Sequence, residues 1–147
     1  MVGSTYGHFP ASTWEGDTDA FVAKCDAEGH VQWTRQFGTL TTDFESGIAI
    51  EPSGQVFVAG MTSGILSNGG GLNGKYHAFV AKYRPNGQQL EIEQSGSNDF
   101  DDVLGIAVDA SVRDIYVVGS TRGSLPGGGG LAGAEDGFVQ HLCFTKH

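Results

Sequence analysis

Two glycine-rich segments have the spacing of a dinucleotide-binding loop. Residues 69–74 and residues 128–133 both satisfy the pattern G-x-G-x-x-G. That pattern holds a pyrophosphate when the glycines lead from a strand into the N-terminus of a helix. Here each segment leads into an expected strand, at Phe79 or Phe138. Lys75 follows the first segment as in a P-loop, but the next residue is a tyrosine, where an aliphatic hydroxyl is needed to bind Mg²⁺. We therefore interpret both segments as connectors between strands.

A Gly-x-Thr-x-Gly pattern occurs three times, at residues 3–7, 60–64 and 119–123. It resembles the G-x-S-x-G turn that presents the nucleophile of many hydrolases. An active site normally occurs once in a chain, whereas this pattern recurs at a regular spacing. We therefore expect a structural turn at the end of a strand and assign no catalytic residue.

The five histidines, at positions 8, 30, 77, 141 and 147, include no close pair with the spacing of zinc ligands. We expect most of them at the surface and predict no zinc site.

Two groups of aspartates could bind a cation. Asp17 and Asp19 form one group, and Asp99, Asp101 and Asp102 form the other. Carboxylate oxygens are ligands that Ca²⁺ prefers, but neither group completes an EF-hand type of loop. Carboxylates in polar loops more often face water or accept hydrogen bonds from turn amides. We expect no cofactor and keep Ca²⁺ as an alternative.

These motifs lie within a repeat of about 58 residues. The segment Ala20–Lys24 recurs identically at Ala78–Lys82 and more loosely at Gly137–His141. With the same spacing, Gly47–Glu51 matches Gly105–Asp109. The chain therefore holds about two and a half copies of one unit, and such self-similarity is typical of repeat architectures.

The repeat predicts which polar positions are structural. Asp43 and Asp101 occupy equivalent positions, which favours a hydrogen bond in the link before one strand of each copy. His77 occupies the position that Asp19 and Asp136 hold in the other copies.

The repeat also predicts the core. The three equivalent phenylalanines and the two equivalent isoleucines are expected to be buried: Phe21, Phe79, Phe138, Ile48 and Ile106.

Trp33 has Glu91 as its counterpart, so one copy has an aromatic residue that the next copy lacks. We expect Trp33 to pack in the core or between copies. A platform for stacking a glycan is the alternative.

The complete central copy contains four short runs rich in β-branched and aromatic residues, near Ser46–Glu51, Gln55–Thr62, His77–Tyr83 and Gln88–Gln94. Turn sequences with proline early and glycine late separate two pairs of these runs, which favours antiparallel hairpins. No segment has a capped helical periodicity. The sequence therefore predicts an all-β protein in which each unit is a four-stranded blade of a β-propeller.

Four segments in combination resemble the bacterial β-propeller repeat family SBBP: Asp19–Lys24, Trp33–Gly38, Gly47–Ile50 and Val58–Thr62. The resemblance implies a strand order within a blade. Gly47–Glu51 is innermost, followed by Val56–Thr62, Ala78–Tyr83 and Gln88–Gln94. Residues 112–114 and 144–147 depart from the repeat.

On this reading residues 1–147 form one partial propeller domain, with blades at about 1–40, 44–97 and 102–147. The first blade lacks its inner strand and the last blade lacks its outer strand. Ten strands cannot close a ring of the four to eight blades that propellers use. We predict a fragment of a longer array or a chain that another protein completes.

The composition of the chain limits the classes of binding partner that we expect. Seventeen acidic against eight basic residues give a formal charge of −9, which disfavours nucleic acid and anionic membranes. No stretch approaches the roughly 20 apolar residues of a membrane span, and no leader is visible, so we expect a soluble chain. Cys25 and Cys143 lie in different copies and are expected to be free thiols, and the compartment stays undecided.

The function that these observations favour is a non-catalytic protein-interaction or scaffold module, acting as an accessory subunit of a larger complex. Its partner would be another protein chain or further blades of its own parent chain. The alternatives are a secreted or surface module that binds glycan or Ca²⁺, and a fragment of a larger propeller enzyme.

Overall fold

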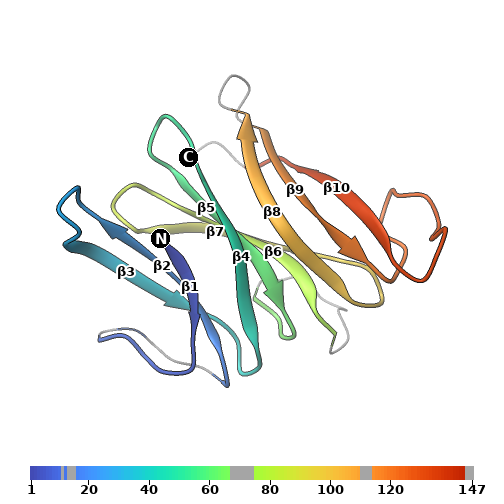
Figure 1. Cartoon of the computed structure of the whole chain (residues 1–147), viewed down its shortest axis with the longest axis horizontal. Helices are drawn as coiled ribbons and strands as arrows, with labels where there is room; N and C mark the ends of the chain where they lie inside the picture. Colours follow the sequence, from blue (N-terminus) through green and yellow to red (C-terminus); the bar gives the residue numbers. More distant parts are fainter. Residues whose placement is uncertain (11, 13–15, 67–74, 110–113, 145–147) are drawn as a thin grey trace.

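The computed structural model of the chain describes residues 1–10, 12, 16–66, 75–109 and 114–144. These residues form ten β-strands in three antiparallel sheets, which stand side by side (Figure 1). The part of the chain that the structure describes contains no helix, and hence none that could cross a membrane. The all-β prediction is confirmed.

The sheets contain three, four and three strands in sequence order. The first sheet contains β1 (Val2–Thr5), β2 (Asp19–Cys25) and β3 (Val31–Phe37). The central sheet contains β4 (Asp43–Ile50), β5 (Val56–Thr62), β6 (His77–Tyr83) and β7 (Gln89–Ser95). The third sheet contains β8 (Asp101–Asp109), β9 (Asp114–Thr121) and β10 (Asp136–Leu142).

The strand order in the central sheet, β4-β5-β6-β7, is the one that the family resemblance implies. The first sheet has no strand equivalent to β4, and the third sheet has none equivalent to β7 among the residues described. Strand β4, which the family resemblance places innermost, begins at Asp43, three residues before the predicted Ser46. Its pairing with β5 passes through a bulge between Glu45 and Gly47, which extends the strand beyond the apolar run that was used to predict it.

Two hairpin turns have the geometry that their sequences predict. Gly54 and Gly87 end the Pro-Ser-Gly and Pro-Asn-Gly turns with φ angles of 83° and 81°. Their amides donate to the carbonyl oxygens of Glu51 and Arg84 at 2.8 and 2.9 Å. Glycine adopts this left-handed backbone without steric cost, so both turns close tightly.

Two apolar clusters join the sheets. Between the first and central sheets, Val22 packs with Val56, Val58, Ala81 and Tyr83. The cluster between the central and third sheets consists of these buried residues: Phe57, Ala59, Ala78, Val80, Val103, Ile115, Val117 and Leu142. The central strands β5 and β6 are therefore buried on both faces. Burial of one such Val or Phe side chain contributes about 1.5–3 kcal/mol.

The predicted core residues are buried to different degrees. Phe79 is fully buried, whereas Phe138, Trp33, Ile48 and Ile106 are half-buried against the clusters.

Phe21, the remaining predicted core residue, is also half-buried, and its ring packs edge-on against Phe9 with 5.0 Å between the ring centroids. The first sheet has no neighbour on the side away from the central sheet among the described residues, so its Phe21 is less covered than Phe79.

The bulge recurs in the third sheet, between Val103 and Gly105. At both bulges the opposite strand passes very close. A Cβ atom on Gly60 would meet the carbonyl oxygen of Phe44 and would come 2.8 Å from the Phe79 ring. Gly119 has the equivalent surroundings, with the Asp102 carbonyl and the Phe138 ring. The repeated glycine is therefore explained by close packing rather than by a special backbone angle.

We predict that Gly60→Ala lowers the free energy of unfolding by about 1–3 kcal/mol, because the added methyl group forces apart two paired strands. Urea unfolding monitored by circular dichroism measures this change. Gly130→Ala is the control, since a Cβ there meets nothing within 4 Å, and it should change the stability by less than about 0.5 kcal/mol. Equal effects of the two substitutions would contradict the packing assigned to Gly60.

Candidate functional site

The three Gly-x-Thr-x-Gly segments form the structural turns that their repetition predicts. In each, the threonine Oγ1 accepts the amide of the glycine two residues later. The distances are 3.1 Å for Thr5, 3.0 Å for Thr62 and 3.1 Å for Thr121. Because each hydroxyl oxygen accepts a hydrogen bond from a turn amide, the pattern stabilises the turn at the end of a strand.

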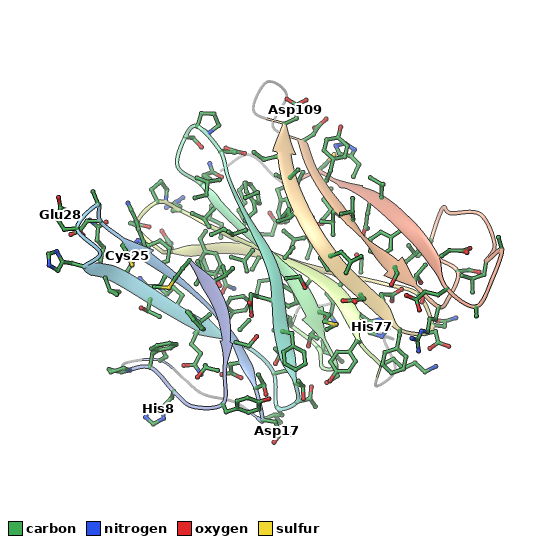
Figure 2. The ribbon with its side chains drawn as sticks, viewed as in Figure 1. His8, Asp17, Cys25, Glu28, His77 and Asp109 are labelled. Carbon is green, nitrogen blue, oxygen red and sulfur yellow. The ribbon has the colours of Figure 1, made fainter. Side chains whose placement is uncertain are left out.

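A buried polar junction links the central and third sheets around Asp101. This carboxylate accepts the Ser97 amide at 2.7 Å and the Thr121 hydroxyl at 2.6 Å. Nδ1 of His77 lies 3.1 Å from its Oδ2. Both His77 and Asp101 are at most 1% exposed. Figure 2 shows His77 among the strands, whereas His8 and Asp17 lie at the periphery.

The same junction recurs between the first and central sheets, with Asp19 in place of His77 and Thr39 in place of Ser97. Asp43 accepts the Thr39 amide at 2.6 Å and the Thr39 hydroxyl at 3.0 Å. Asp19 stands where His77 stands in the other junction, and its Oδ2 accepts Nε2 of Gln36 at 2.9 Å. Both aspartates are fully buried. The hydrogen bond predicted in the link before the inner strand is confirmed for Asp43 and Asp101.

Two carboxylates share the junction of the first and central sheets, and this perturbs one of them. Burial raises the pKa of Asp43 above its ordinary value, and the nearby charge of Asp19 acts in the same direction. Hydrogen bonds from Thr62 and Thr39 oppose this rise in pKa. The second oxygen of Asp43, Oδ1, accepts no hydrogen bond of good geometry from the described residues.

Two glutamines complete the repeated network. Gln36 Nε2 donates to the Gly7 carbonyl at 2.9 Å, and its Oε1 accepts the Phe9 amide at 2.9 Å. Gln94 makes the equivalent bonds to the Gly64 carbonyl and the Leu66 amide, at 2.8 and 2.9 Å. Each glutamine lies on the last strand of its sheet, β3 or β7, and fixes the loop that follows β1 or β5, two places away in the same sheet. The sequence interpretation missed this role, although the two glutamines recur 58 residues apart.

The aspartates considered as Ca²⁺ ligands are not brought together. Asp17 is exposed beside the first sheet, and Asp19 and Asp101 belong to the two separate junctions. Asp99 pairs with Lys75 at 2.8 Å, and Asp102 lies half-buried on β8. Across the described ranges no three His, Cys, Asp or Glu side chains gather in a way that could hold a metal ion.

Trp33 packs between the first and central sheets. Its Nε1 donates to the Pro85 carbonyl at 3.1 Å, and its ring lies against Gly87. The Arg35 guanidinium lies 5.7 Å from the ring centroid and donates to the Gly87 carbonyl at 2.7 Å. These contacts support the packing interpretation of Trp33.

The glycine-rich segment 128–133 lies in the connection between β9 and β10 and leads into a strand, as predicted; residues 69–74 lie outside the described residues. Of the other histidines, His8, His30 and His141 are exposed, and His147 is not described. Both cysteines are free thiols.

One face of the third sheet is uncovered and apolar. Tyr116, Val118 and Val139 are 37%, 41% and 72% exposed. Pairing places Val139 directly across from Val118. The equivalent residues of the central sheet are Phe57, Ala59 and Val80, and all are buried by the third sheet. The third sheet therefore exposes the positions through which the central sheet packs against its neighbour.

Comparison with known proteins supports the repeat. Residues 32–67 match the family model of SBBP, described as a β-propeller repeat, which confirms the resemblance over these residues. The chain is also similar to the regulatory protein FlaEY of Caulobacter vibrioides, with 32% identity over 107 residues. The match covers 70% of this chain and 10% of that protein, so the chain spans only about a tenth of the relative's length.

We predict that Thr121→Val lowers the free energy of unfolding by about 1.5–3 kcal/mol, because the buried Asp101 carboxylate loses a short hydroxyl donor. Thr121→Ser keeps the hydroxyl and should lose less than about 1 kcal/mol, since serine lacks only the methyl group. Urea unfolding at neutral pH compares the two variants. A valine variant as stable as the serine variant would show that the bond to Asp101 contributes little.

A pH dependence follows from the raised pKa of Asp43. Between that raised pKa and the ordinary value of 3.8, the folded chain holds more protons than the unfolded chain. The contribution of Asp43 to the free energy of unfolding therefore falls as pH rises through this interval. We predict that wild type loses stability relative to Asp43→Asn as pH increases from about 4 to 7, since asparagine does not titrate. Urea unfolding at several pH values measures the difference, and a difference that stays constant with pH would contradict the prediction.

Proposed function

For a chain that carries a β-propeller repeat at residues 32–67, we propose a non-catalytic role as an assembly module that binds another protein through the open face of its third sheet. The observation that carries the proposal is the exposure of Tyr116, Val118 and Val139 at positions whose counterparts in the central sheet are buried.

The covered counterparts indicate the chemistry of the partner. In the central sheet, Phe57, Ala59 and Val80 pack against Ile115, Val117 and Leu142 of the next sheet. The partner surface would therefore be another twisted β-sheet that presents branched aliphatic side chains at alternate positions. Such a surface occurs in a further copy of the repeat, carried by a partner chain or by the parent protein.

The polar side chain of Asp136, at the start of β10, supports the same kind of partner. Asp136 occupies the position of Asp19 and His77, each of which lies beside an aspartate of the following sheet. Asp136 is half-buried and accepts the Ala132 amide at 2.7 Å. A partner sheet that begins with an equivalent of Asp43 or Asp101 would rebuild the junction there.

The known relative fits an assembly role. FlaEY is named a regulatory protein and is about ten times as long as the matched segment. A small repeat segment in a long regulatory chain can act by holding other segments in place, without chemistry of its own.

To test the proposal, a photoreactive phenylalanine analogue replaces Tyr116 in the chain expressed in its native cells. We expect a cross-link to a peptide from a β-sheet segment with alternating aliphatic residues. Val118→Asp should reduce the cross-link at least tenfold, because a carboxylate would be buried against apolar side chains, whereas Val118→Thr keeps the shape and should retain most of it.

The matched control places the analogue at Tyr6, which is 80% exposed on the first sheet's loop. Equal cross-linking at positions 6 and 116, or insensitivity to Val118→Asp, would rule out the third-sheet face as the binding surface.

A further inference from the structure

The outer edge of β10 lies where a fourth strand would pair. In the other two sheets, β3 pairs with β2 and β7 pairs with β6, both antiparallel. Within the described residues β10 pairs only with β9, so the backbone groups along its outer side are available. In Figure 1, β10 stands at one end of the array, with its preceding loop extending beyond it.

A groove runs along this edge. Its volume is about 640 Å³, and it is lined by Asp136–His141 together with the loop residues 125–131 and Ser95. This loop lies over the position beside β10 that is equivalent to the position of β7 beside β6. An extended segment of six or seven residues matches the length of β10, which has seven residues.

The strands β3 and β7 specify what fits beside β10. Each carries the glutamine that binds the loop of its own sheet through one carbonyl and one amide. By repeat position, the corresponding groups in the third sheet are the Gly123 carbonyl and the Leu125 amide. A strand with glutamine opposite Phe138 would reach both, because Gln36 lies opposite Phe21 and Gln94 lies opposite Phe79.

A glycine two residues later is the second requirement. A Cβ atom on Gly38 would come 2.5 Å from Oδ1 of Asp19, and one on Gly96 would come 2.5 Å from Nδ1 of His77. Asp136 occupies the same position in the third sheet. The glycine leaves space for this polar side chain.

Two described residues follow β10, Cys143 and Phe144, and neither lines the groove. The Phe144 ring instead packs against Phe57 of the central sheet, with 5.5 Å between the ring centroids. The Lys82 ammonium lies 5.7 Å from both rings. Cys143 and Phe144 therefore leave the groove open.

Resting on the proposed interaction function, we propose that the edge of β10 binds, by antiparallel strand addition, an extended Gln-x-Gly segment of a partner chain that carries the same repeat. Main-chain hydrogen bonds supply the affinity of such a complex, and side-chain pockets supply its specificity. Here the glutamine and the glycine provide the specificity.

The probe is a synthetic peptide with the sequence of residues 30–39, which contains Gln36 and Gly38, titrated into the whole chain. We expect saturable binding that shifts the backbone amide resonances of Phe138, Val139 and Gln140. The Gln36→Ala peptide should bind at least tenfold more weakly, since it loses two hydrogen bonds. The Gly38→Val peptide should not bind measurably, because its side chain meets Asp136.

The control peptide carries Gln32→Ala, at an exposed position of β3, and should bind within about twofold of the parent. The Val118→Asp chain should also bind the parent peptide within about twofold, so failure of the face and failure of the edge are distinguishable. Shifts away from β10, or equal binding of the Gln36→Ala and parent peptides, would overturn the proposal.

Discussion

Each sheet of this protein buries its apolar faces only by packing against another sheet. The central sheet has a neighbour on both sides, and its strands β5 and β6 are buried almost throughout. The third sheet has one neighbour among the described residues, and β9 alternates between buried and exposed positions. The same sequence pattern therefore gives a two-sided core in one sheet and a half-open surface in the next. This constraint explains why Tyr116, Val118 and Val139 of the third sheet are exposed.

Polar groups at the junctions fix how the sheets are aligned. A buried aspartate at the start of β4 or β8 accepts the amide of a residue four positions earlier. It thereby shapes the link between two sheets while facing a side chain of the preceding sheet. Hydrogen bonds of this kind are directional, whereas apolar contacts are not. The apolar clusters hold the sheets together, and the junctions define their relative position.

Much of the fold could be predicted because the repeat allowed each position to be compared in two or three copies. The ten strands and the threonine turns follow from superposing the copies. The strand order and the missing inner and outer strands follow from the family resemblance. The start of β4 at Asp43 could not be predicted from apolar periodicity, because a bulge interrupts the alternation there. The loop-fixing roles of Gln36 and Gln94 depend on which backbone groups lie near them in space. Exposure of Phe21 relative to Phe79 depends on a neighbouring sheet, which no local pattern encodes.

The change from Asp19 in one junction to His77 in the next makes the copies unlike in charge. A histidine facing Asp101 can supply a donor to a carboxylate, whereas an aspartate facing Asp43 brings a second acceptor. Since both junctions have an aspartate at the start of the following sheet, the residue that faces it determines whether a donor or a second acceptor is present. The two junctions therefore share one backbone arrangement but differ in the hydrogen bonds that their buried side chains can make.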